Sequence, residues 1–181
     1  TSIINTYRGV GFPDSAKVCY RVQTIDSCGN LSDTSKAHCQ INLKANPGNQ
    51  ENNLYWTPYK GWKADTVEVQ RLNAGAWQPI DTLSGTDTAY TDQGLQCNKA
   101  YTYRVKYFEA GGNDQTSLSD SITVTPFDTV SPQTPSIAPT TTLNDATLQT
   151  SWTASSGDVD RYVVYRGDGN GNFSAQDTLQ S

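Results

Sequence analysis

The sequence predicts an all-β protein built from repeated β-sandwiches, and three observations point to this fold class. Apolar and polar residues alternate with a period of two along the chain, and no segment shows the 3.6-residue period of an amphipathic helix. Gly, Asn, Asp and Pro separate the alternating segments at short intervals. The third observation is an internal repeat, because segments of the chain recur further along it.

Seven short strands divided by turns are expected in the middle of the chain, which is typical of a sandwich. They span residues 41–45, 53–57, 66–72, 77–83, 88–91, 100–109 and 121–125. In the longest strand, Tyr101, Tyr103, Val105 and Tyr107 alternate with a set of residues that includes Arg and Lys. Because neighbouring side chains of a strand point to opposite faces, these four residues are expected to face the core.

Two alignments within the chain define the repeat. The Tyr-Arg-Val sequence at 20–22 recurs at 103–105, a shift of 83 residues, and the Trp-Thr sequence at 56–57 recurs at 152–153. The middle of the chain carries both patterns, whereas each end carries one. We therefore expect the C-terminal half of a repeat at 1–41, a complete repeat at 42–127 and the N-terminal half of a further repeat at 128–181.

Residues of the complete repeat carry a family resemblance. Trp56, on the second expected strand, resembles the core tryptophan of fibronectin type III domains. Leu95 followed by Tyr101 resembles their Leu…Tyr corner, where the tyrosine hydroxyl ties a loop to the strand. The resemblance covers nearly the whole chain and implies tandem fibronectin-type-III-like (Ig-like) sandwiches, one complete and two partial. It implies a structural core that contains Trp56, Leu95, Tyr101, Tyr103 and Trp152.

The first half-repeat departs from this pattern at its corner. Phe12 and Val18 stand where the complete repeat has Leu95 and Tyr101, so the tyrosine anchor is missing. A disulfide is expected to compensate for it.

Four cysteines, Cys19, Cys28, Cys39 and Cys97, form no Cys-x-x-Cys pair. The chain has one histidine, His38, which adjoins Cys39. This spacing favours one or two disulfides in an oxidising compartment over a zinc site. Four cysteines allow three full pairings, all of which stay open, and Cys97 is either unpaired or bridges repeats.

The phrase CYRVQTIDSCGN at 19–30, followed by HC at 38–39, resembles repeats in very large surface proteins of gliding, Bacteroidetes-type bacteria. Those proteins often end in a gliding-motility-associated C-terminal region. The resemblance therefore implies that the protein is either secreted or located on the bacterial outer surface. The net charge of −5 disfavours nucleic acid as a partner. No apolar run approaches the roughly 20 residues of a membrane span, so membrane insertion is not expected.

The loop between the second and third expected strands carries Tyr59 and Trp62, the candidate binding residues. The matching loop at 154–160 has no aromatic residue, so the repeat itself does not require them. Exposed aromatic rings can stack on a sugar ring or anchor a protein partner. The competing interpretation, packing against the neighbouring repeat, is the one that we favour.

Two motifs overlap at residues 166–172. Arg166-Gly167-Asp168 spells the integrin-binding tripeptide, but Arg166 also matches Arg71 in the alignment of the repeat. The alternating oxygen side chains from Asp168 resemble the start of a calcium loop, yet its twelfth position is Leu179 instead of an acid. We therefore expect a polar hairpin turn, and neither a metal site nor a cofactor.

The chain is predicted not to be an enzyme, because His38 has no evident nucleophile partner. The expected function is a structural spacer or adhesion module of a larger protein, stiffened by the proline-rich segment 126–139. Two alternatives stay open: a carbohydrate- or protein-binding module that uses Tyr59 and Trp62, and an accessory domain of a polysaccharide-degrading enzyme. The expected partners are neighbouring repeats, polysaccharide, and a second copy that associates head to tail by domain swapping of the split repeat.

Overall fold

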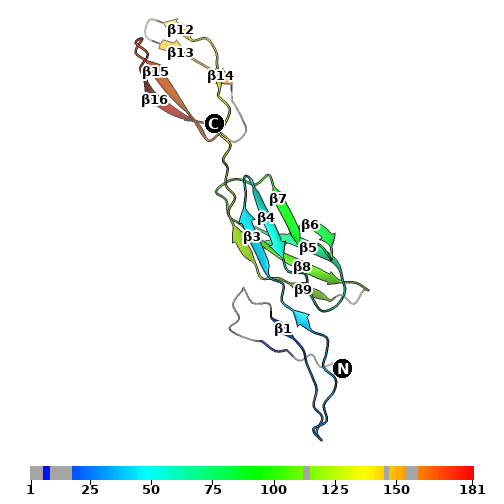
Figure 1. The fold of residues 1–181 in the computed structure, drawn as a ribbon. Helices are drawn as coiled ribbons and strands as arrows, with labels where there is room; N and C mark the ends of the chain where they lie inside the picture. The colour runs from blue at the N-terminus through cyan, green and yellow to red at the C-terminus, as the bar shows by residue number, and fades with distance from the viewer. Residues whose placement is uncertain (1–5, 9–17, 112–114, 145–146, 154–158) are drawn as a thin grey trace. The chain divides into compact units, whose positions relative to one another are not determined.

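The computed structural model of the chain describes residues 6–8, 18–111, 115–144, 147–153 and 159–181 (Figure 1). These residues form sixteen β-strands, which confirms the all-β fold class. They belong to two compact units, Thr1–Asp128 and Thr129–Ser181. Within the described ranges, no helical segment has the length and apolarity needed to cross a membrane. Phe12 and most of the 154–160 loop lie outside the described residues.

Two antiparallel sheets form a complete sandwich in the first unit. One sheet has the order β3 (Leu43–Pro47), β4 (Glu51–Trp56), β7 (Ala89–Gln93). The other has the order β10 (Ile122–Val124), β8 (Tyr101–Glu109), β5 (Ala64–Asn73), β6 (Ala76–Ser84), with β9 (Thr116–Leu118) also paired to β8. This partition of consecutive strands between two sheets is that of a fibronectin-type-III-like sandwich.

All seven strands expected from the alternation are present, with ends shifted by a few residues. The alternation missed β9, which pairs with β8 through only three residues from Thr116 to Leu118. Strand β10 pairs with the same edge of β8 further along, from Ile122 to Val124. The two short strands are thus parts of one interrupted edge, and neither is long enough to show a clear period.

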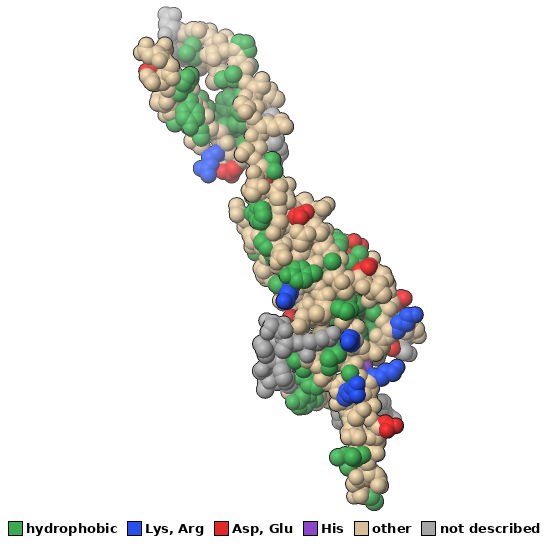
Figure 2. All heavy atoms as spheres, in the orientation of Figure 1, with side chains coloured by type: hydrophobic (Ala, Val, Ile, Leu, Met, Phe, Trp, Pro, Cys, Tyr) green, Lys and Arg blue, Asp and Glu red, His purple; other side chains and the backbone are tan. Residues whose placement is uncertain are grey.

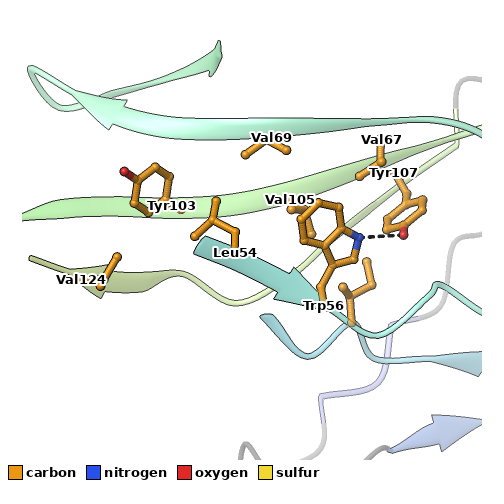
Figure 3. Packing of buried hydrophobic residues seen from close by; sticks show 9 residues of the cluster. Leu54, Trp56, Val67, Val69, Tyr103, Val105, Tyr107 and Val124 are labelled. Atoms are coloured by element: carbon orange, nitrogen blue, oxygen red, sulfur yellow. Dashed lines mark hydrogen bonds between the residues drawn. The ribbon is translucent and has the colours of Figure 1, made fainter. Parts of the chain in front are cut away.

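The core lies between the two sheets (Figure 3). On β8, Tyr103, Val105 and Tyr107 are fully buried, which confirms the predicted alternation. Trp56 reaches them from β4, and its Nε1 donates a hydrogen bond of 2.9 Å to the hydroxyl of Tyr107. The indole ring is therefore buried, and its N–H group has a hydrogen-bond acceptor, as a buried tryptophan requires. Further core residues are Ile41, Leu54, Val67, Val69 and Val124.

A buried polar network lies beside this apolar core. Asn52 Nδ2 donates to the hydroxyl of Tyr103 at 3.1 Å, and that hydroxyl donates to Asp92 Oδ2 at 2.8 Å. Arg71 completes the network with an ion pair of 2.7 Å to the same oxygen. Burial raises the pKa of Tyr103, so the hydroxyl stays protonated and able to donate at neutral pH.

The N-terminal segment contains one small antiparallel pair, β1 (Cys19–Tyr20) and β2 (His38–Cys39). A disulfide joins Cys19 to Cys39 across this pair. Tyr20 matches the buried Tyr103 in sequence, yet it is 45% exposed, and Val22 is 67% exposed. The segment therefore holds its strand pair without the apolar core that covers β8.

The described residues of the C-terminal unit form three two-stranded antiparallel sheets. These are β11 (Ser136–Ile137) with β14 (Trp152–Thr153), β12 (Thr141–Asn144) with β13 (Thr147–Gln149), and β15 (Arg161–Gly167) with β16 (Phe173–Gln180). A cleft of about 480 Å³ opens between them, and Figure 2 shows hydrophobic side chains gathered around this hollow. The division of the chain into one complete and two partial repeats stays a prediction.

The first residues of the proline-rich segment are held on the complete sandwich by burial and by backbone hydrogen bonds. Pro126 is fully buried. The N–H of Phe127 donates to the carbonyl of Gly48 at 3.1 Å, and the N–H of Gln50 donates to the carbonyl of Phe127 at 2.7 Å. The chain therefore leaves the sandwich after these residues instead of at the end of β10.

Candidate functional site

The candidate site is the 57–63 loop, which connects β4 to β5 in the complete sandwich. The rings of Tyr59 and Trp62 lie 4.3 Å apart between centroids and are tilted by 43°. Tyr59 also lies 5.9 Å from the ring of Tyr107 in the core. Both loop aromatics are half-buried and pack against the core, so they extend it outward through the loop.

The same loop contacts the N-terminal segment. The hydroxyl of Tyr59 shares a hydrogen bond of 2.5 Å with Nδ1 of His38, and the two rings are 6.0 Å apart. Next to this contact, the backbone N–H of Cys39 donates to the carbonyl of Lys60 at 2.9 Å. Burial, and then the negative charge of Glu109, raises the pKa of Tyr59, so its hydroxyl stays protonated at neutral pH.

Gly61 lies between the two aromatic residues and permits the Tyr59–His38 contact. A Cβ placed on Gly61 would overlap the hydroxyl of Tyr59 and Nδ1 of His38. The sequence pattern did not predict that Gly61 and His38 are parts of this site. A glycine flanked by aromatic residues, and a histidine beside a half-cystine, were the signals available.

The arrangement is suited to packing and stacking. The outer parts of Tyr59 and Trp62 offer an amphipathic surface to a sugar ring or a peptide. His38, the one candidate base, is engaged with Tyr59. Among the described residues, no group of three or more His, Cys, Asp and Glu side chains is placed to hold a metal ion.

The residues expected in the structural core have differing surroundings. Trp56 and Leu95 are buried at 5% and 6% exposure, and Tyr103 is fully buried. Tyr101 is half-buried, and its hydroxyl accepts a hydrogen bond of 3.1 Å from the N–H of Gln96, which ties the loop to β8. Trp152 is also half-buried and packs on Tyr162, with ring centroids 5.5 Å apart.

The cysteines fall into two groups. Cys19 and Cys39 form the disulfide of the N-terminal segment, and Cys39 is only 6% exposed. Cys28 and Cys97 are free and exposed. The sequence left open which cysteines pair, and the structure contains the single disulfide Cys19–Cys39.

Arg166 and Gly167 end β15, and residues 168–172 form a polar turn between β15 and β16. The carboxylate of Asp168 accepts hydrogen bonds from the side chain of Asn172 at 2.9 Å and from the N–H groups of Asn170 and Asn172 at 2.8 and 3.2 Å. These bonds, led by the one from the Asn172 side chain, lower the pKa of Asp168. The polar hairpin turn that the sequence predicts is therefore organised around the Asp168 carboxylate.

A curated relative is similar to more than half of the chain. A stretch of 116 residues is 36% identical to part of exoglucanase B of Cellulomonas fimi. The match covers 59% of this chain and 10% of the exoglucanase, so the chain spans about a tenth of the length of that relative. No protein-family model matches the sequence.

Solved structures with a similar arrangement of strands include two carbohydrate-active enzymes and a set of fibronectin domains. Pectate lyase PelI of Erwinia chrysanthemi has 22% identity over 46% of this chain and 28% of its own, with a TM-score of 0.41. The β-1,2-glucanase of Parabacteroides distasonis has 18% identity over 49% and 12%, with a TM-score of 0.41. The FN1–FN3 domains of chicken CNTN1 have 14% identity over 91% and 65%, with a TM-score of 0.39. Because the TM-scores are below 0.5, the fold assignment rests on strand order and register instead.

Proposed function

We propose that this chain is a non-catalytic module of a larger extracellular protein that degrades polysaccharide, and that its sandwich repeats serve as a spacer. The observation that carries the proposal is the 36% identity over 116 residues to exoglucanase B. Because the match covers only 10% of that protein, a module is a better description than a whole enzyme. The disulfide between Cys19 and Cys39 supports an oxidising, extracellular location.

The geometry of the complete sandwich supports the spacer role within this proposal. The chain enters beside the 57–63 loop, where the N–H of Cys39 is bonded to Lys60, and it leaves through the pinned residues Pro126 and Phe127. Both connections are backbone contacts with the sandwich rather than free tethers. A module whose entry and exit are bonded to its own body keeps those two points at a fixed separation, which suits a spacer.

The coding sequence around this segment is the first test. The proposal expects a catalytic domain for polysaccharide cleavage in the same open reading frame. A reading frame that contains only further sandwich repeats would contradict the link to polysaccharide degradation. The finer expectation, a surface protein of gliding, Bacteroidetes-type bacteria, stays a prediction that the same sequence tests.

A second candidate function is carbohydrate binding through Tyr59 and Trp62, which the half-exposed pair of rings favours. Isothermal titration with cello-oligosaccharides, together with a pull-down on microcrystalline cellulose, tests it on the full chain. A spacer shows no binding in either assay, whereas a binding module binds and loses affinity in Trp62→Ala.

Trp77→Ala is the matched control for this assay. Trp77 lies on β6 of the same sandwich, and Arg104 covers its ring at 4.3 Å from the centroid. Loss of binding in both variants would indicate general damage to the sandwich, so thermal unfolding of each is measured alongside. Loss only in Trp62→Ala would favour the binding function over the spacer.

A further inference from the structure

Strand β2 has hydrogen-bonded neighbours on both of its edges. The N–H of Gln40, just after β2, donates to the carbonyl of Val18 at 2.9 Å, on the side of β1. The N–H of Cys39 points the other way and donates to Lys60 of the complete sandwich at 2.9 Å. Successive backbone N–H groups of a strand point to opposite edges, so β2 is shared between the N-terminal segment and the 57–63 loop.

Side chains reinforce the contact of β2 with the loop. His38 meets the hydroxyl of Tyr59, whose ring packs on Trp62 and on Tyr107. Gly61 has no room for a side chain at this place. We name this contact of His38 and Cys39 with residues 59–62 the clasp. The clasp connects β2 to the core, because Tyr59 packs on Tyr107 and the hydroxyl of Tyr107 accepts a hydrogen bond from Nε1 of Trp56.

At the position that matches the disulfide, the complete repeat has a pair of threonines. On β8 and β10, Thr102 and Thr123 are cross-strand partners, and their hydroxyls share a hydrogen bond of 2.8 Å. Cys19 matches Thr102 in the repeat and pairs with Cys39 in the same way. The strand pair β8–β10 is supported by a core, whereas β1–β2 is not. Two strands without a packed face are marginal in water, so the covalent bond is what holds β1 and β2 together as a pair.

We infer that the 57–63 loop is a docking surface for the strand end of the preceding repeat, and that the Cys19–Cys39 disulfide keeps this clasp closed. The partner is an extended His-Cys strand whose N–H and imidazole meet the carbonyl of Lys60 and the hydroxyl of Tyr59. The clasp holds whether or not the chain serves a polysaccharide-degrading protein, so it goes beyond the proposed function. It gives the joint two states, one closed with the disulfide and one open with two thiols.

Opening the joint requires a dithiol reductant. A thiolate of the reductant attacks the exposed sulfur of Cys19, forms a mixed disulfide there and releases the Cys39 thiolate. The second thiol of the reductant then displaces Cys19, and the reductant ends as a disulfide. Cys19 and Cys39 have then each gained one electron and one proton. Without the bond, β2 keeps its two-residue pairing with β1 and the contacts of the clasp itself, from Cys39 to Lys60 and from His38 to Tyr59.

Hydrogen exchange at two adjacent amides tests the clasp in the full chain. The Cys39 amide reports the clasp, the Gln40 amide reports the β1–β2 pair, and the Ser119 amide, bonded to Val105 at 3.0 Å, is the control in the complete sandwich. Cys28→Ser and Cys97→Ser are included throughout, because both thiols are free and exposed and a free thiolate is able to attack a disulfide. Spectra are compared before and after treatment with dithiothreitol.

We expect exchange of the Cys39 amide to accelerate at least about tenfold on reduction, while the Ser119 amide changes by less than about twofold. The double variant Cys19→Ser with Cys39→Ser gives the same result without reductant. Unchanged exchange at Cys39 in both experiments would overturn the role of the disulfide. Acceleration at Ser119 to the same extent would also overturn it, because the effect would then be unfolding of the sandwich.

Gly61→Ala separates the docking surface from the disulfide. The added methyl group displaces the contact between Tyr59 and His38 while the disulfide stays intact. We expect faster exchange at Cys39 and unchanged exchange at Gln40. Tyr59→Phe, which keeps the ring but removes the hydroxyl, is expected to give a smaller change of the same kind. Equal acceleration at Cys39 and Gln40 in Gly61→Ala would overturn the clasp as a separate element.

Discussion

Trp56 and Trp152 occupy matching positions in the two units, on β4 and β14, but their surroundings differ. Trp56 is 5% exposed, and its Nε1 is bonded to Tyr107 of β8. Trp152 is half-buried and packs on Tyr162 of β15, a strand of the same C-terminal unit. The same Trp-Thr sequence thus lies in a closed core in one unit and at the edge of a cleft in the other.

The difference between the two tryptophans shows which strands cover the apolar face of the sandwich. Strands β7 and β8 pair with β4 and β5, and β8 supplies Tyr103, Val105 and Tyr107 to the core. Among the described residues of the C-terminal unit, β14 pairs only with β11 and β15 only with β16. The described strands of the C-terminal unit therefore form hairpins locally and leave an apolar face open at the cleft.

Truncation of the two tryptophans gives the largest expected contrast. Trp56→Ala removes a buried ring and its hydrogen bond, so we expect it to lower the free energy of unfolding by about 3–5 kcal/mol. Trp152→Ala removes a half-exposed ring and is expected to cost about 1 kcal/mol. Native-state hydrogen exchange on β5 and β15 measures the two units separately. Equal costs would mean that the cleft of the C-terminal unit is closed in solution.

The matching arginines sharpen the same comparison at a smaller scale. Arg71 pairs with the buried Asp92, with 31% of the arginine side chain exposed. Because that exposure lets solvent screen the pair, we expect Arg71→Ala to cost about 2 kcal/mol rather than the full value for a buried pair. Arg166 has no such ion pair described, and Arg166→Ala is expected to stay within about 0.5 kcal/mol. Urea unfolding of the two variants checks this, and a larger cost for Arg166→Ala would contradict it.

Alkaline pH is expected to weaken the complete sandwich through its buried tyrosines. Burial raises the pKa of Tyr103 above its ordinary value of 10.0. Below about pH 10 both the folded and unfolded states carry the proton, so stability does not depend on this group. Above it the unfolded state releases the proton first, and the free energy of unfolding falls by up to about 1.4 kcal/mol per pH unit. Urea unfolding from pH 8 to 11 measures the slope.

Tyr103→Phe is the control for this pH dependence. The variant is expected to have a shallower slope above pH 10, because one proton fewer is linked to folding. An unchanged slope would assign the effect to other groups. Tyr107, whose pKa is also raised by burial, then becomes the next residue to test.

Association of copies through the split repeat is the smallest effect that we expect. The N-terminal segment of a second copy would bring Tyr20 and Val22 to the cleft, in the places of Tyr103 and Val105. In the same register, however, Thr24 replaces Tyr107, so Trp152 would lack the hydroxyl that Trp56 has. We therefore expect weak association, with a Kd near 1 mM. Light scattering that shows a constant monomer mass up to that concentration would rule it out.

Much of the fold follows from the sequence because the pattern of a strand is local. Period-two alternation assigns Tyr103, Val105 and Tyr107 to one face of β8 without reference to any other strand. Strand β9 was missed for the same reason, since three residues beside a turn carry too little pattern. The candidate loop was likewise visible as a departure from the repeat, because Tyr59 and Trp62 have no counterpart in the matching loop.

The partners of these residues came from the tertiary structure alone. The bond from Trp56 to Tyr107 joins residues 51 apart, and the contact of His38 with Tyr59 joins residues 21 apart. The choice of Cys39 as the partner of Cys19 depends on the pairing of β1 with β2. A local pattern states which face a side chain points to, but only the packing of sheets and loops determines which side chain it meets there.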